Sequence, residues 1–314
     1  MHIRHIGKSG LRVSSIGLGC NNFGLTIEAQ ESKKIIHRAL DLGVTLFDTA
    51  PVYGTEFGAS ENILGASLGK HRQDVTIVSK FGMTTTPGQR DSSRSGIIRG
   101  LEDSLRRLGT DYLDVFMLHW PDKNTPMQET LRALDDIIRS GKTRYIGCCN
   151  LPAWQIADAQ WIAKSELLHD FIVCQDEYSL VQRKAETNLF PALQHYGMGL
   201  MPYSPLANGL LTGKYSDAGK APTDTRLATN LWNTGDRYLT SNNLALTERL
   251  TEYAQQHDHS LLEMAVSWLL SEPLVCSVIA GARSIEQLNA NAEAGEWQLS
   301  GEQMQEIAAL CSQD

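Results

Sequence analysis

Amphipathic stretches that end in glycine, each followed by a short apolar run, recur along this chain and constrain its fold more than any other feature. In three of these stretches apolar residues recur at helical spacing, and the glycine suits the left-handed backbone just past a helix end. The stretches are ESKKIIHRALDLG (31–43), IIRGLEDSLRRLG (97–109) and MQETLRALDDIIRSG (127–141). They predict helices whose buried faces carry Ile35, Ile36, Ala39 and Leu40, then Ile98, Leu101, Leu105 and Leu108, then Met127, Leu131, Leu134 and Ile138.

Eight short apolar runs have the composition of buried strands. They are SIGLG (15–19), VTLFD (44–48), DVTIVSK (74–80), YLDVFMLHW (112–120), TRYIG (143–147), FIVCQ (171–175), MGLMPYS (198–204) and LVCSVIAG (274–281). Because a helix separates most of them, we expect parallel strands that are buried on both faces. Eight such units predict one α/β domain over residues 1–314, a (β/α)8 TIM barrel, with a doubly wound sheet as the alternative.

Two segments depart from this rhythm. Residues 2–19 predict a β-hairpin that turns at residues 8–10 and closes the bottom of the barrel. Residues 206–243 are polar and glycine-rich without periodicity, and a connection of that length is typical of a lid. We expect this lid loop to lie on the C-terminal face of the barrel, over cofactor and substrate.

Composition excludes several classes of function. The net charge of −8 and the lack of a dense Lys/Arg run argue against nucleic-acid and anionic-membrane partners. Six scattered cysteines form no C-x-x-C pair, so they indicate neither a zinc site nor a disulfide framework. Neither a signal peptide nor an apolar run of membrane-spanning length is visible. A cytoplasmic protein without a metal is therefore predicted.

Polar side chains gather where the predicted strands end. Six successive strands end in Asp48, Lys80, His119, Asn150, Gln175 and the pair Tyr203–Ser204. Each alone is explained as well or better by a structural role such as a cap or a solvated charge. Because barrel enzymes build their sites at the C-terminal ends of the strands, the six together predict one site.

A phenol, Tyr53, lies five residues after Asp48 in FDTAPVYG (47–54). Free phenols titrate near 10, and a neighbouring ammonium such as Lys80 lowers that pKa. Asp48 would keep the ammonium charged and in place, and His119 would orient a substrate oxygen. This set of groups suits protonation of a carbonyl oxygen while a hydride reaches its carbon. GLGCNNFG (17–24) lacks the third glycine of a Rossmann fingerprint, so the residues alone do not name the hydride source.

Separate motifs in the right order resemble the aldo-keto reductases. They are FDTAPVYG, VSKFG, LHW, GCCN, MPYSPLANGLLTGKY and VIAGARSIEQLNAN, and the resemblance runs through essentially the whole chain. It implies a metal-free (β/α)8 barrel that reduces aldehydes or ketones with NAD(P)H. The family's catalytic tetrad falls on Asp48, Tyr53, Lys80 and His119, with Tyr53 as general acid.

The resemblance also implies a set of cofactor contacts. Asn150 and Gln175 would bind the nicotinamide carboxamide, beside Cys149, and Tyr203 would stack on the ring. The pyrophosphate would lie on Ser204, Pro205, Leu206 and Gly209, near Lys214, and the adenosine on Gly281, Ala282, Arg283, Gln287 and Asn291. A helix starting at Ser284 would add its positive end, and Arg283 suits a 2′-phosphate, so NADPH is preferred over NADH.

Two positions depart from the family pattern, and the substrate is weakly determined. Cys149 replaces a common serine and Ala290 an acidic residue, which weakens one hydrogen bond and one adenine contact. Packing explains a cysteine at position 149 better than a redox switch does. The pocket for a small aldehyde or ketone would be walled by Phe23, Val52, Trp120 and Trp232, and Arg226 or Arg237 could bind an acidic substrate.

Two other functions stay open. One is a cofactor-sensing binding protein with little turnover, because barrels of this family also occur as channel-associated β subunits. The other is a lyase or isomerase that uses Lys80 as a Schiff-base amine. Oligomeric state cannot be read from the sequence.

Overall fold

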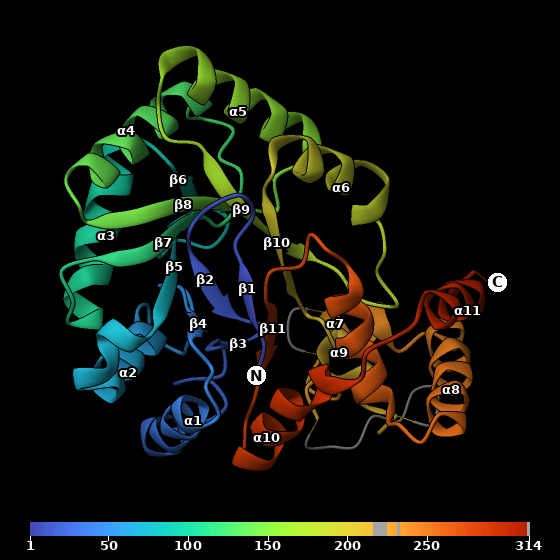
Figure 1. The fold of residues 1–314 in the computed structure, drawn as a ribbon. Helices are drawn as coiled ribbons and strands as arrows, with labels where there is room; N and C mark the ends of the chain where they lie inside the picture. The colour runs from blue at the N-terminus through green and yellow to red at the C-terminus, as the bar shows by residue number, and fades with distance from the viewer. Residues whose placement is uncertain (216–224, 231–232, 313–314) are drawn as a thin grey trace.

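The computed structural model of the chain describes residues 1–215, 225–230 and 233–312. Its centre is a ring of eight parallel strands in the order β10-β9-β8-β7-β5-β4-β3-β11 (Figure 1). Their bounds are β3 Ile16–Gly19, β4 Leu46–Asp48, β5 Thr76–Met83, β7 Leu113–Leu118, β8 Thr143–Cys149, β9 Phe171–Glu177, β10 Gly199–Tyr203 and β11 Val278–Gly281. The Leu200 amide donates to the Leu274 carbonyl at 2.7 Å and the Cys276 amide to the Leu200 carbonyl at 2.9 Å, which joins the two ends of the sheet. The predicted (β/α)8 barrel is confirmed, and an open doubly wound sheet is excluded.

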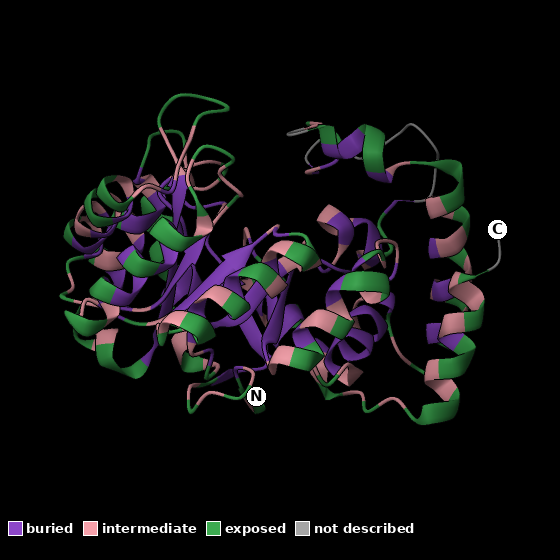
Figure 2. Ribbon diagram, turned by 90° about the horizontal axis from the view of Figure 1, so that it is seen from above, coloured by how far each residue is buried: buried purple, intermediate pink, exposed green. Residues whose placement is uncertain are grey.

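Helices cover the outside of this ring. They are α1 Ala29–Asp41, α2 Ala59–Leu68, α3 Arg94–Leu108, α4 Met127–Arg139, α5 Ala153–Glu166, α6 Ala185–Tyr196, α9 Leu261–Ser271 and α10 Ile285–Glu293. Viewed from above, the buried strands lie at the centre and the helices turn exposed faces outward (Figure 2). Among the described residues, no helix is both long and apolar enough to cross a membrane.

The helical faces differ from the sequence prediction at two isoleucine pairs. In α3 the buried residue is Ile97, whereas Ile98 is 38% exposed. In α4 Ile137 is buried and Ile138 is half-buried. Two adjacent isoleucines satisfy the spacing almost equally well, so the sequence pattern cannot choose between them.

Two strands run further than predicted. β5 continues past Lys80 to Met83 and then pairs with the short antiparallel strand β6, Arg90–Asp91. β9 continues past Gln175 to Glu177. Lys80 and Gln175 therefore lie within their strands, where regular hydrogen bonding holds their backbone more firmly than a loop would.

The N-terminal hairpin closes the bottom of the barrel, as predicted. Strands β1, Ile3–His5, and β2, Arg12–Ser14, pair antiparallel. Ile6 and Val13 are fully buried and pack with the side chains that fill the inside of the barrel, among them Leu46, Val115 and Met201. A separate and larger core lies between the strands and the helices.

The predicted lid is described only in part. A 3-10 turn spans Ala207–Thr212, a short helix α7 spans Thr234–Tyr238, and helix α8 begins at Ser241, inside the segment predicted to be a loop. Residues 216–224 and 231–232 lie outside the described residues. After α8, which ends at Gln256, the chain is completed by α9, β11, α10 and α11, Gly301–Cys311.

The hairpin turn gives a first testable prediction. A Cβ at Gly7, which has a φ of +51°, would lie 2.5 Å from the Gly197 carbonyl oxygen and 2.8 Å from the Ile172 carbonyl oxygen. We expect Gly7→Ala to lower the free energy of unfolding in urea by at least about 2 kcal/mol, because left-handed strain and a backbone clash add. Gly10→Ala in the same turn is the control, since a Cβ there would meet no atom within 4 Å. Equal stability of the two variants would contradict this account of how the barrel is closed.

Candidate active site

The candidate site is organised around the ammonium group of Lys80, which has no solvent-exposed side-chain surface. Its Nζ donates to Asp48 Oδ1 at 2.6 Å, to the Thr49 carbonyl at 3.0 Å and to the Tyr53 hydroxyl at 3.3 Å. The three acceptors use all three protons of the ammonium. Asp48 ends β4 and Lys80 belongs to the neighbouring strand β5, so parallel pairing brings their side chains together.

These contacts set the charge state of Lys80. Burial alone would lower the pKa of Lys80, but Asp48 and Tyr53 together raise that pKa above its ordinary value. The ammonium therefore stays protonated throughout the physiological range.

Tyr53 is a protonated phenol at neutral pH. Burial raises the pKa of Tyr53 to about 12, while the Lys80 ammonium acts in the opposite direction and Asp48 in the same direction as burial. The sequence analysis expected Lys80 to lower this pKa. Lys80 does so, but in the protein without cofactor or substrate burial outweighs it. A protonated phenol is the form that a general acid needs.

Backbone hydrogen bonds fix the loop that carries Tyr53. Its amide donates to the Ala50 carbonyl at 3.1 Å, and its carbonyl accepts from the Ser60 amide at 3.1 Å. The Ser60 and Thr49 hydroxyls lie 2.9 Å apart, and the Ser60 hydroxyl also donates to the Cys20 carbonyl at 2.8 Å. The start of α2 thus holds both ends of the turn from Thr49 to Tyr53.

A buried carboxylate that the sequence analysis missed ties this turn to β5. Glu61 in α2 has no exposed surface, accepts from the Ser79 hydroxyl at 2.6 Å and pairs with Arg107 Nε at 2.6 Å. Ser79 precedes Lys80, so the contact joins the segment bearing the phenol to the strand bearing the ammonium. An acidic residue at helical spacing from Leu64 and Leu68 in α2, ASENILGASL, was the signal that could have revealed it.

His119 is the second polar group facing Tyr53. It follows β7, and its amide donates to the Phe81 carbonyl at 2.9 Å. Its ring makes an edge-on contact with the Tyr53 ring, with the centroids 5.9 Å apart. Burial lowers the pKa of His119 well below its ordinary value, and Lys80 and Arg90 lower that pKa further. The imidazole is therefore neutral at pH 7, and its Nδ1 is buried with no hydrogen-bond partner in the described part of the chain.

The predicted nicotinamide residues form one network with the tetrad. Gln175 Nε2 donates to Asp48 Oδ1 at 2.9 Å, and Asn150 Nδ2 donates to the His119 carbonyl at 3.0 Å. The Tyr203 hydroxyl donates to Asn150 Oδ1 at 3.0 Å. Cys149 is buried, with its Sγ 3.9 Å from Gln175 Oε1, and burial raises its pKa, as expected for a packing cysteine. The structure thus brings together the polar ends of β4 to β10.

The residues after β10 form a compact turn with unusual backbone angles. Ser204, Ala207, Asn208 and Gly209 all have positive φ values. The Ala207 amide donates to the Ser204 carbonyl and the Gly209 amide to the Leu206 carbonyl, both at 2.8 Å, and these bonds close the turn. A Cβ on Gly209 would lie 3.2 Å from Lys214 Nζ, so the lysine packs directly against this turn. Pro205 and Leu206 complete it and are buried and half-buried.

The predicted adenosine residues lie on a second segment, from the end of β11 into α10. The Arg283 amide donates to Gln287 Oε1 at 2.9 Å, and Asn291 Nδ2 donates to the Gly281 carbonyl at 3.3 Å. Ser284 caps α10 by accepting from the Gln287 amide at 3.3 Å. The helix itself begins at Ile285, one residue later than predicted. Ala282 is fully buried.

The four residues predicted to wall the substrate pocket have different environments. Trp120 is 40% exposed at the end of β7, and Val52 is half-buried next to Tyr53. Phe23 is fully buried in the core between strands and helices, so it offers no surface to a substrate. Trp232 lies outside the described residues.

The two lid arginines also differ. Arg237 is paired with Glu177, which also accepts from the Tyr238 hydroxyl, and these contacts attach α7 to the end of β9. Arg226 is half-buried and close enough to Tyr53 and Arg283 to interact electrostatically with both. Burial lowers the pKa of Arg226.

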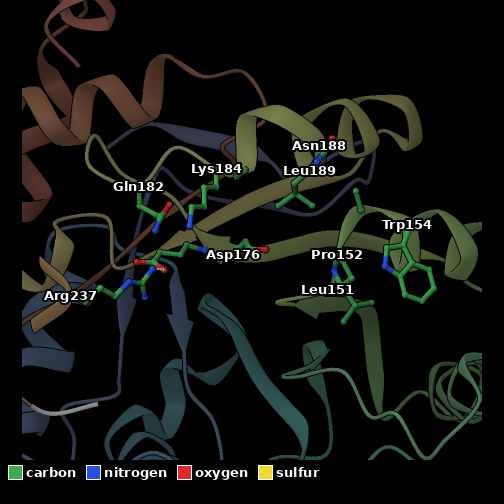
Figure 3. A pocket seen from close by; sticks show the side chains of 12 residues that line it. Leu151, Pro152, Trp154, Asp176, Gln182, Lys184, Asn188, Leu189 and Arg237 are labelled. Atoms are coloured by element: carbon green, nitrogen blue, oxygen red, sulfur yellow. Dashed lines mark hydrogen bonds and ion pairs between the residues drawn. The ribbon is translucent and has the colours of Figure 1, made fainter. Parts of the chain in front are cut away.

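A groove of about 640 Å³ adjoins the barrel rim (Figure 3). It lies between the starts of α5 and α6, and its lining includes Trp154, Asp176, Glu177, Lys184 and Arg237. None of the four tetrad residues lines it, so the groove is separate from the Tyr53–Lys80 centre. In the described parts of the chain no group of three or more His, Cys, Asp or Glu side chains could hold a metal ion.

Comparison with known proteins identifies the class. The model of the aldo/keto reductase family matches residues 15–311, so the chain belongs to this family. It is 38% identical to a probable voltage-gated potassium channel subunit beta of Oryza sativa subsp. japonica over 94% of this chain and 91% of the relative. It is 37% identical to the L-glyceraldehyde 3-phosphate reductase of Escherichia coli O157:H7 over 94% and 87%, and 33% identical to an uncharacterised oxidoreductase of Bacillus subtilis (strain 168) over 96% and 93%. These relatives support an oxidoreductase.

The buried ion pair gives a prediction about stability. Lys80→Met leaves the Asp48 carboxylate buried without its cation, so we expect the free energy of unfolding to fall by about 3 kcal/mol or more. Adding Asp48→Asn should recover part of that loss, because the amide needs no counter-ion. Urea unfolding of the two single variants and the double variant measures the coupling. A Lys80→Met protein as stable as the wild type would show that the pair does not hold the site together.

Proposed function

We propose that this protein reduces aldehyde or ketone carbonyls to alcohols by transfer of hydride from NADPH, with Tyr53 as the general acid. The observation that carries the proposal is the Tyr53 hydroxyl, held 3.3 Å from the buried Lys80 ammonium and facing the His119 ring. Membership of the aldo/keto reductase family supports the same chemistry.

Each residue would have a defined role in the reaction. NADPH, when bound, supplies the hydride that adds to the carbonyl carbon. The carbonyl oxygen takes the Tyr53 proton as negative charge develops on it, and the Lys80 ammonium stabilises the phenolate left behind. The neutral His119 imidazole would donate a hydrogen bond that orients this oxygen. In alcohol oxidation the phenolate would take the proton back.

The residues present fit the cofactor. Asn150 and Gln175 carry amide groups of the kind that bind a carboxamide, and Tyr203 offers an aromatic ring beside them. Lys214, which packs on the turn from Ser204 to Gly209, would bring positive charge to a pyrophosphate there. Gly281, Ala282, Gln287 and Asn291 would hold the adenosine, and Arg283 at the start of α10 would bind the 2′-phosphate, which favours NADPH over NADH.

The substrate would be a small aldehyde or ketone placed between Val52, Trp120 and the lid. The name of one relative makes glyceraldehyde 3-phosphate a member of the panel to test. The prediction of a cytoplasmic location stays a prediction.

A cofactor-sensing protein with little turnover is the second candidate, because several relatives are named as channel subunits. The intact tetrad does not decide against it. The Schiff-base alternative is disfavoured, since it needs a neutral amine, whereas Asp48 and Tyr53 raise the pKa of Lys80.

The test is turnover by wild type and Tyr53→Phe, with NADPH or NADH and a panel of carbonyl compounds. We expect the wild type to oxidise NADPH and the variant to lose about 10³-fold in kcat while it still binds NADPH, because only the proton donor is removed. Tyr253→Phe is the control, since that phenol bonds Glu306 on the surface, far along the chain from the site.

The outcomes separate the candidates. Retention of more than a tenth of wild-type kcat by Tyr53→Phe would exclude Tyr53 as the acid. Tight NADPH binding by a wild type that reduces no carbonyl would favour the sensing protein.

A further inference from the structure

A half-buried cation, Arg90, lies beside the mouth of the barrel. It belongs to β6 and pairs with Met83, near the end of β5. Two residues further along, the Ser92 amide donates to Asp122 Oδ2 at 2.9 Å. Asp122 lies three residues after His119, in the loop that follows β7. β6 is therefore held against both the strand that carries the buried ammonium and the loop that begins with the imidazole.

The side chains of β6 point to opposite sides. Asp91 turns toward the start of α3, where it accepts from the Ser93 amide at 3.1 Å, and a Cβ on Gly96 would lie 2.5 Å from Asp91 Oδ1. Because adjacent side chains of a strand alternate, Arg90 points away from α3. Burial lowers the pKa of His119, and the positive charge of Arg90 lowers that pKa further. The guanidinium thus lies on the side of β6 that faces the imidazole.

Arg90 makes no ion pair with any residue that the structure describes. Its one hydrogen bond there runs from Nη1 to the carbonyl of the neighbouring Gln89 at 3.1 Å. The acids of the same region have other partners, since Asp91 pairs with Arg99 at 3.4 Å and Asp122 accepts from amides and hydroxyls. Buried charges are normally paired, so a half-buried guanidinium without a carboxylate has capacity for an anion.

We propose that Arg90 binds an oxyanion, either a carboxylate or a phosphate, on the carbonyl substrate; this proposal rests on the carbonyl reduction proposed for the same site. The carbonyl group would lie between Tyr53 and His119, and the anionic end of the same molecule would lie on the His119 side, at Arg90. A guanidinium presents paired N–H donors that match two oxygens of a carboxylate or a phosphate.

The substrate class that follows is a short aldehyde or ketone with an acidic group at its other end. Arg237, one of the two arginines that the sequence indicated for an acidic substrate, already pairs with Glu177. A hydrogen bond to a charged group is strong enough to change a binding constant by about 10-fold or more. The anionic group should therefore dominate the choice among small carbonyl compounds.

Matched pairs of substrates test the proposal. Succinic semialdehyde and butanal have the same chain length and differ in the carboxylate, and glyceraldehyde 3-phosphate and glyceraldehyde differ in the phosphate. With NADPH at constant ionic strength, Arg90→Met should lower kcat/KM for the anionic member of a pair by at least about 10-fold and change that for the neutral member by no more than about twofold. The pair with the larger loss shows which oxyanion is preferred.

Two further variants are the controls. Arg90→Lys keeps the charge without the paired donors, so it should recover only part of the loss. Arg99 is 73% exposed and pairs with Asp91 on the α3 side of β6. Arg99→Met therefore removes the same charge without touching the mouth of the barrel, and it should discriminate between the substrates like the wild type.

Binding without turnover separates this proposal from the proposed function. In the presence of NADP⁺, which cannot reduce an aldehyde, calorimetric titration gives the dissociation constants of succinic semialdehyde and glyceraldehyde 3-phosphate. Arg90→Met should raise the dissociation constant of the preferred anion by at least about 10-fold. A protein that reduces no carbonyl but binds the anion through Arg90 would contradict only the proposed function.

Three results would overturn the anion site. They are equal losses of kcat/KM for anionic and neutral substrates in Arg90→Met, anion binding that is unchanged in this variant, and a wild type that binds neither anion. Circular dichroism of every variant confirms that it is folded.

Discussion

A buried ammonium is costly unless its protons are all hydrogen-bonded, and the C-terminal rim of this barrel meets that demand at Lys80. Asp48, the Thr49 carbonyl and Tyr53 supply the three acceptors, and all three come from the end of β4 and the turn after it. The charge of Lys80 therefore fixes the position of the phenol. The same contacts that keep the ammonium protonated also place the Tyr53 phenol at the mouth of the barrel.

Contacts on the outside and on the inside of the barrel stabilise this arrangement of Lys80, Asp48 and Tyr53. Outside, Glu61 joins α2 to β5 through Ser79 and is neutralised by Arg107. Inside, Gln175 donates a second hydrogen bond to Asp48 Oδ1, the oxygen that also accepts from Lys80. The N-terminal hairpin fills the bottom of the barrel with Ile6 and Val13, so the polar groups are confined to the opposite end. A well-packed lower half allows the rim to be polar.

The sequence was sufficient to predict the barrel, because the helical spacing of apolar residues, the glycines at helix ends and the eight apolar runs mark the helices and strands directly. It also predicted, from their places near strand ends, that Asp48, Lys80 and His119 belong to one site, which stays a prediction. It could not choose between Ile97 and Ile98, where neighbouring residues have the same chemistry. It missed Glu61, because pairing with Arg107 and Ser79 depends on contacts distant in sequence. The sequence also could not predict that the pKa of Tyr53 is raised, because the burial that raises this pKa is a property of the fold.

Hydride transfer itself is the most direct test of the proposed reduction. NADPH carrying deuterium on one or the other face of nicotinamide C4 would be incubated with the protein and a small aldehyde, and the alcohol analysed by mass spectrometry. In the proposed site the nicotinamide ring would stack on Tyr203 and be held by Asn150 and Gln175, which would leave one face exposed. Deuterium should therefore reach the alcohol carbon from only one of the two cofactors. Deuterium transferred from neither cofactor, or equally from both, would contradict the proposed site.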